Sequence, residues 1–127
     1  MQIKVDDIDQ WGIEGTSERI IARVSIEIPV CLSIDIDVLD VVFAQTPGIP
    51  EAGGWSTREL IRILEGIGGL NVVGADIVEV APAYDSVGEP TSIAAAQIVY
   101  EVLTSIVKRG LTAVANSSKA NLLRDEL

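Results

Sequence analysis

The most regular alternation of hydrophobic and polar residues lies between residues 30 and 37. Val30, Leu32, Ile34 and Ile36 occupy every second position, and a period of two is typical of a β-strand. A second stretch, residues 71–80, is rich in valine and isoleucine, which favours a second buried strand. The pattern therefore predicts two strands about forty residues apart, with Pro- and Gly-rich loop sequence after the first.

Three helices are expected around these strands. Residues 13–24 indicate a short helix, and residues 92–108 indicate the longest one. The helix between the strands begins at Ser56, because Ser56 and Glu59 have the spacing of a capping box, and we expect Gly68-Gly69 to end it. Residues 110–127 are polar without a clear period, so we expect a frayed tail there.

The element order is helix, strand, helix, strand, helix, without internal repeats. A helical crossover between two strands implies a parallel pair connected in the right-handed sense, so the fold class is α/β. Parallel sheets are normally buried on both faces and have several strands. We therefore expect this chain to be one end of a larger doubly wound sheet, or a protomer that completes its sheet with a partner.

Composition narrows the classes of function. The 127 residues fit one domain, and 48% of them are hydrophobic, enough for a packed core. Nine basic against nineteen acidic residues give a net charge of −10, which argues against nucleic acid and anionic membrane surfaces as partners. The absence of histidine excludes a Ser-His pair or an imidazole metal ligand from this chain. The single cysteine, Cys31, excludes an intrachain disulfide, and its place in a strand predicts burial.

The chain ends give an expectation about location. Residues 1–10 are acidic and short of apolar side chains, so they do not resemble a signal peptide. Residues 93–107 are too short and too interrupted to span a membrane. We expect a cytoplasmic protein, and we interpret the match of residues 124–127 (RDEL) to a retrieval signal as chance.

Carboxylates gather where the two predicted strands end. Asp35 and Asp37 lie two apart, so a strand would direct both to one side. Because neighbouring carboxylates repel each other, a hard cation such as Mn²⁺ or Mg²⁺ would stabilise the pair. Glu79 would lie on the same rim, where it could bind a guanidinium group. The alternatives are a pair of solvated acids at a loop entry, and a Glu79 that pairs with an arginine such as Arg58 or caps a loop.

Three segments, residues 33–40 (SIDIDVLD), 50–60 (PEAGGWSTREL) and 71–85 (NVVGADIVEVAPAYD), together resemble the C-terminal part of the ureohydrolase family of arginases and agmatinases. The agmatinase branch is the more similar, and the resemblance covers residues 8–108. It implies the C-terminal portion of a three-layer α/β/α arginase-type fold with parallel strands. We accordingly divide the chain into a partial ureohydrolase domain, residues 1–108, and a polar tail, residues 109–127.

The resemblance also implies site roles. Asp35 corresponds to the catalytic aspartate that bridges two manganese ions, Asp37 to a ligand of one ion, and Glu79 to the glutamate that holds the guanidinium of the substrate. The implied reaction is hydrolysis of a guanidino compound, such as agmatine to urea and putrescine, by water activated on the metal pair. The remaining four of six ligands come, in the family, from upstream histidine motifs with no counterpart here. We therefore expect the isolated chain to bind Mn²⁺ weakly and to release no urea.

Other hypotheses stay open at this point. The chain could be a non-catalytic truncated fragment, or an interaction module that pairs with a full-length relative or forms a homo-oligomer, as the family's enzymes usually do. The residues Asp35-x-Asp37-Val38-Leu39 also resemble the nucleophile motif of haloacid-dehalogenase-type phosphatases, although Gly74-Ala75-Asp76 and Lys108 are poor matches to the rest of that pattern. Which guanidino compound would be the substrate is also left open.

Overall fold

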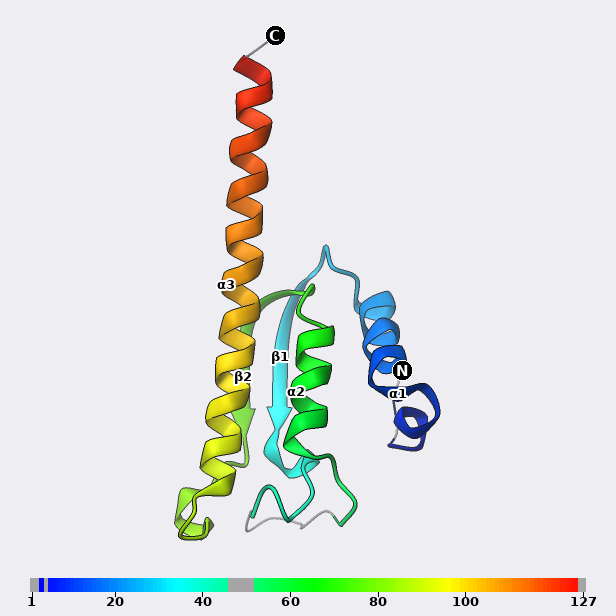
Figure 1. The fold of residues 1–127 in the computed structure, drawn as a ribbon, viewed down its shortest axis with the longest axis vertical. Helices are drawn as coiled ribbons and strands as arrows, with labels where there is room; N and C mark the ends of the chain where they lie inside the picture. Colours follow the sequence, from blue (N-terminus) through cyan, green and yellow to red (C-terminus); the bar gives the residue numbers. More distant parts are fainter. Residues whose placement is uncertain (1–2, 4, 46–51, 126–127) are drawn as a thin grey trace.

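The structure is a computed structural model that describes residues 3, 5–45 and 52–125 (Figure 1). Helices pack against a two-stranded sheet, and the short 3₁₀ turns lie just after the strands. In chain order the elements are α1 (Val5–Val24), β1 (Pro29–Asp35), η1 (Ile36–Val38), α2 (Thr57–Gly66), β2 (Asn71–Val78), η2 (Pro82–Tyr84) and α3 (Pro90–Asp125).

The two strands are parallel, as the sequence predicts. Asp35, the last residue of β1, is opposite Val78, the last residue of β2, so both strands end at the same level. The register shifts by one residue between Val30 and Cys31. The helical crossover through α2 connects them, which confirms an α/β fold with parallel strands.

The hydrophobic core lies on one face of this sheet, under α2 and α3. It joins the inward positions of β1 to the buried faces of both helices, and Ile36 and Ile98 have no exposed surface at all. On the other face Cys31, Ser33 and Asp35 are exposed. Burial of Cys31 was therefore a wrong expectation, because it assumed a sheet covered on both faces. The buried core residues are Ile34, Ile36, Leu39, Ala44, Leu60, Leu64, Ile67, Leu70, Ala94, Ala95, Ile98 and Val102.

The capping box predicted for the crossover helix is present. The Glu59 amide donates to Ser56 Oγ at 3.3 Å, and the Ser56 amide donates to Glu59 Oε2 at 2.8 Å. Two N–H groups that the helix leaves unpaired are thereby satisfied. The helix ends at Gly66, slightly before the predicted Gly68-Gly69.

The N-terminal helix is longer than predicted and is interrupted at Gly12, whose φ of 69° is left-handed. It packs on α2 so closely that neither helix has room for a larger side chain at the contact. A Cβ on Gly66 would collide with the Ser17 side chain, at 2.7 Å from Ser17 Cβ. An ion pair of 2.9 Å between Arg62 and Glu14 flanks this contact.

The C-terminal helix differs most from expectation. We predicted a frayed tail after Lys108, but α3 continues to Asp125, and its second half extends beyond the rest of the molecule (Figure 1). Adding a residue to an existing helix is far easier than starting one, so Gly110 does not stop it. We expected residues 93–107 to be too short and too interrupted to span a membrane, but the helical segment Pro90–Lys119 is long and apolar enough to do so by length and composition, a test that core helices of soluble proteins also pass. The division of the chain at residue 108 stays a prediction.

Candidate functional site

The carboxyl ends of the two strands bring Asp35 and Glu79 to the same edge of the sheet. Asp35 closes β1 opposite Val78, and Glu79 is the next residue after Val78. Both are exposed. Glu79 adopts φ 62°, a left-handed backbone that turns the chain sharply out of β2. The backbone placement agrees with the rule that ligands of open α/β sheets bind beyond the strand ends.

Asp37 reaches this edge in a different way from the one predicted. It lies in η1, outside the strand, because Asp35 Oδ1 accepts the Asp37 amide at 2.9 Å and begins the turn. The period-two argument, which put both side chains on one side of a strand, therefore does not apply to Asp37. Its side chain is partly buried, and the buried Oδ1 atom has no hydrogen-bond partner.

Asp40 organises the loop that follows η1. Its Oδ1 accepts the Val42 amide at 2.9 Å and its Oδ2 accepts the Gly53 amide at 2.8 Å. The hydrogen bonds from Val42 and then Gly53 hold the pKa of the Asp40 carboxyl below its ordinary value. The Asp40 amide also donates to the Trp55 carbonyl at 2.9 Å, so this hydrogen bond connects the segment after η1 to the segment before α2.

Asp85 has the matching role after β2. It accepts the Ser92 amide at 2.8 Å and the Thr91 amide at 3.3 Å, and so caps the first turn of α3. Desolvation raises the pKa of Asp85, but the bonds from Ser92 and Thr91 outweigh it and the net pKa is lowered. The buried Thr91 hydroxyl accepts the Gln45 amide at 2.7 Å and joins the two loops.

Sequence reasoning missed these loop-fastening residues. Asp40 and Asp85 lie in the motifs quoted above, but their hydrogen-bond partners are defined only once the loops are folded. The one available signal was Pro90 followed by Thr91 and Ser92, a typical start of a helix. An aspartate a few residues upstream is then a candidate cap.

The described residues do not by themselves fit a pair of manganese ions. In residues 3, 5–45 and 52–125 no group of three histidine, cysteine, aspartate or glutamate side chains is arranged to hold a metal. The unpaired Asp37 Oδ1 fits one metal–oxygen bond, and the exposed Asp35 carboxylate is close by in the chain. Hard divalent cations take about six oxygen ligands, so any complete site needs donors that this arrangement lacks.

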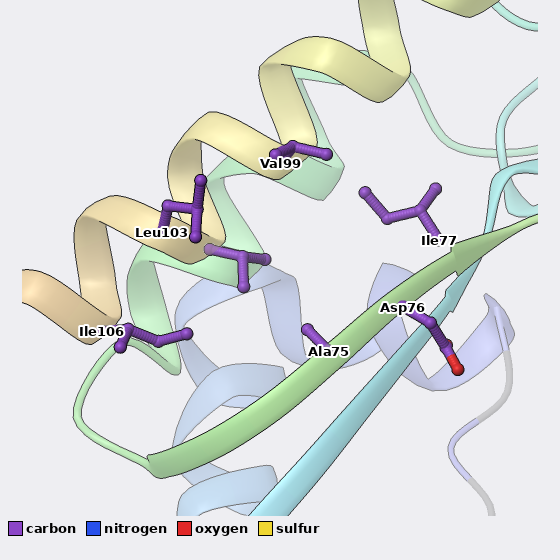
Figure 2. Close-up of a pocket in the computed structure, with 7 residues that line it drawn as sticks. Ala75, Asp76, Ile77, Val99, Leu103 and Ile106 are labelled. Atoms are coloured by element: carbon purple, nitrogen blue, oxygen red, sulfur yellow. The ribbon is translucent and has the colours of Figure 1, made fainter.

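An apolar groove of about 300 Å³ lies elsewhere, between β2 and α3 (Figure 2). It contains none of Asp35, Asp37 or Glu79, and the carboxylate of Asp76 points away from it (Figure 2). A mostly apolar groove has no partner for a guanidinium group, so the candidate site is the strand-end rim. The groove is lined by Ala75, Asp76, Ile77, Val99, Val102, Leu103 and Ile106.

Comparison with protein families matches residues 1–105 to the arginase family. The chain belongs to this family. This match assigns the Asp35–Asp37 motif to the arginase family and not to haloacid-dehalogenase-type phosphatases. Among curated relatives, this arginase-family chain is 50% identical over 117 residues to "Putative agmatinase 3" of Schizosaccharomyces pombe, covering 92% of the chain and 28% of the relative. It is 48% identical over 101 residues to the agmatinase of Photorhabdus laumondii, covering 80% and 32%.

Solved structures agree on the fold. The proclavaminate amidino hydrolase of Streptomyces clavuligerus superposes with a TM-score of 0.79 at 38% identity, covering 84% of this chain and 36% of that one. Arginase from Bacillus caldovelox gives a TM-score of 0.67 at 27% identity over 82% of this chain and 34% of that one. The chain thus spans about a third of the length of the relatives it matches, and its fold is part of an arginase-type α/β fold.

Proposed function

We propose that this chain contributes the strand-end carboxylates of a manganese-dependent guanidino hydrolase. Asp35 and Asp37 would bind the metal, and Glu79 would bind the guanidinium of the substrate. The observation that carries the proposal is Asp37 Oδ1, a buried carboxylate oxygen without a hydrogen-bond partner, beside Asp35 and at the edge where Glu79 leaves β2.

A buried carboxylate oxygen without a hydrogen-bond partner lowers the stability of the fold unless a cation or a hydrogen-bond donor binds it. A divalent metal is a suitable partner, because carboxylate oxygens are ligands that Mn²⁺ prefers. When bound, such metals act as Lewis acids and lower the pKa of water. Glu79 is exposed on its turn, and a carboxylate can accept two parallel N–H bonds from a guanidinium.

The substrate class is a guanidino compound, and agmatine is the first candidate. Support comes from family membership and from the names of relatives, an agmatinase and a proclavaminate amidinohydrolase. We infer that the 127-residue chain alone is inactive, since the described residues offer too few ligands. The missing ligands would come from further polypeptide, and the loops around Asp40 and Asp85 would hold the rim in place to receive them.

A direct assay tests the inferred inactivity. The purified 127-residue chain is incubated with Mn²⁺ and agmatine, and urea is measured against a protein-free control. We expect no urea above the control and only weak Mn²⁺ binding in a titration. Urea release that disappears in the Asp35→Asn variant would show a complete site and overturn this part of the proposal.

A chimera tests the proposed residues. Residues 1–105 replace the matching segment of the Photorhabdus laumondii agmatinase, and the folded chimera is assayed for urea. We expect activity that falls at least about a hundredfold in Asp35→Asn and Asp37→Asn, since each removes a charged ligand, and in Glu79→Gln. The matched control is Glu27→Gln, because exposed Glu27 precedes β1 at the opposite end of the sheet. A folded chimera without activity would favour a non-catalytic interaction module instead.

A further inference from the structure

Two buried side-chain atoms lack a hydrogen-bond partner among the described residues, and they are of opposite kinds. One is Asp37 Oδ1, which accepts, and the other is the indole Nε1 of Trp55, which can only donate. Buried polar groups are nearly always hydrogen-bonded, so an unpaired one calls for an explanation. The strand-end site explains the Asp37 oxygen, but it leaves the Trp55 N–H group without a role.

Backbone hydrogen bonds hold Trp55 against the segment that follows Asp37. The Trp55 amide donates to the Val38 carbonyl at 3.0 Å, and the Trp55 carbonyl accepts the Asp40 amide at 2.9 Å. Val38 is the next residue after Asp37, and both lie in η1. The unpaired donor and the unpaired acceptor therefore belong to two segments that are hydrogen-bonded to each other beyond the end of β1.

Gly54 lets these two segments approach so closely. A Cβ atom on Gly54 would lie 2.6 Å from the Asp40 amide nitrogen and 2.7 Å from the Leu39 carbonyl carbon. Backbone atoms cannot move aside as the end of a flexible side chain can, so only glycine fits at this position. The backbone of Trp55, the next residue, is therefore held in one place beside the turn that carries Asp37.

The N–H group of Trp55 is not needed for packing. The Trp55 side chain is partly buried and packs against the core, which a large apolar side chain without a polar atom could also do. A buried N–H group without a partner lowers the stability of the fold, and a buried tryptophan usually finds an acceptor. Because Nε1 is itself buried, its acceptor has to be a group in its immediate surroundings.

We propose that Trp55 is a positioning residue, whose indole N–H group donates to the Asp37 carboxylate when that carboxylate binds a divalent cation. This role rests on the proposed function, in which Asp37 is a metal ligand. The two roles of Asp37 are compatible, because an ionised carboxylate has about four acceptor sites. Carboxylates that bind metals are themselves held by hydrogen bonds, and loss of such a bond typically weakens metal binding about 10–100-fold.

Mn²⁺ binding by the chimera that carries residues 1–105 tests this role. Trp55→Phe keeps an aromatic ring and removes the N–H group, and electron paramagnetic resonance measures free Mn²⁺ during a titration. We expect the dissociation constant for Mn²⁺ to rise at least about tenfold, while kcat at saturating Mn²⁺ stays within about twofold. Trp11→Phe is the matched control, because Trp11 lies in α1, where its ring centre is 3.9 Å from the Arg19 guanidinium carbon.

The outcomes distinguish a failure of this role from a failure of the proposed function. If Asp37→Asn weakens Mn²⁺ binding but Trp55→Phe does not, the proposed function stands and the role of Trp55 is wrong. If Asp37→Asn leaves Mn²⁺ binding and activity intact, the proposed function is wrong, and the role of Trp55 is wrong with it. Equal weakening by Trp55→Phe and Trp11→Phe would show a general loss of stability and would also overturn the role.

Nuclear magnetic resonance of the 127-residue chain tests the hydrogen bond without any enzyme activity. The chain has two tryptophans, so Trp11→Phe assigns the two indole N–H signals. We expect millimolar Mg²⁺, a diamagnetic hard cation, to move the Trp55 indole proton downfield, as hydrogen bonding does, and to leave the Trp11 signal in place. Asp37→Ala should abolish this shift. A Trp55 signal that stays in place while Mg²⁺ moves the Asp37 amide signal would overturn the role of Trp55, and Mg²⁺ that moves neither signal would contradict the metal site as well.

Discussion

At the scale of single residues, the carboxylates near the strand ends fall into two kinds. Asp40 and Asp85 have their oxygens satisfied by backbone amides of the loops that they hold. Asp37, in contrast, keeps one buried oxygen without a partner. The first kind stabilises the free chain, and the second kind costs stability until something binds it. This contrast separates residues that build the rim from those that would act on it.

Asp40 gives a testable pH dependence. Its pKa in the folded chain lies below the ordinary value of 3.8, so the ionised carboxylate stabilises the fold above that value, and the stabilisation is lost as the pH falls through the folded pKa. Asp40→Asn replaces one acceptor by an NH₂ group that faces a backbone N–H. We expect a lower melting temperature than wild type near pH 7, and a difference that shrinks as the pH falls below 3.8.

Thermal unfolding followed by circular dichroism over this pH range measures the effect. The control is Asp76→Asn, because Asp76 is an exposed strand residue for which the structure shows no corresponding pair of amide donors. A melting difference for Asp40→Asn that is the same at all pH values would contradict the hydrogen-bond argument and point to a steric effect.

At the scale of elements, the packing of α1 on α2 depends on the missing side chain of Gly66. Glycine normally weakens a helix by about 1 kcal/mol relative to alanine. At this position, however, an added Cβ would lie 2.7 Å from Ser17 Cβ, and Ser17 is itself buried. We expect Gly66→Ala to destabilise the fold by about 1–3 kcal/mol, the usual cost of overpacking.

The matched variant is Gly110→Ala in α3, where nothing lies within 4 Å of the added atom. Here alanine should stabilise the chain by up to about 1 kcal/mol. Urea denaturation of both variants measures the two free energies of unfolding. Equal signs would show that helix propensity decides both positions and that the contact between α1 and α2 is loose.

The elements that the sequence predicted well are those whose signals are local. Ser56 and Glu59 define the start of α2 within four residues, and the alternation up to Asp35 defines β1. Predictions failed where a tertiary contact or one hydrogen bond decides the path. Asp35 turns the chain into η1 and so moves Asp37 out of the strand. The length of α3 could not be read from residues 110–125, because continuation of an existing helix needs no strong signal.

At the scale of the whole molecule, stability rests on a core that covers only one face of the sheet. The other face and both outer strand edges lack partners among the described residues, so less apolar area is buried than in a complete three-layer fold. The positions of the strand ends follow from sequence rules for parallel strands. A complete set of metal ligands cannot be predicted in the same way, because the further ligands would have to come from layers that this arrangement lacks.

Because the core covers only one face of the sheet, we expect a small free energy of unfolding, and a substitution at Ile98 tests this expectation. Ile98 has no exposed surface and joins α3 to the core beneath it, and truncation of such a side chain costs about 2–5 kcal/mol. Small domains are often stable by only about 5 kcal/mol, so Ile98→Ala should lower the free energy of unfolding to about 0–3 kcal/mol. Val87→Ala, at a fully exposed valine, should change little. Urea titration followed by circular dichroism measures both. If Ile98→Ala retained a cooperative transition within about 1 kcal/mol of wild type, the chain would have to draw its stability from contacts outside this core.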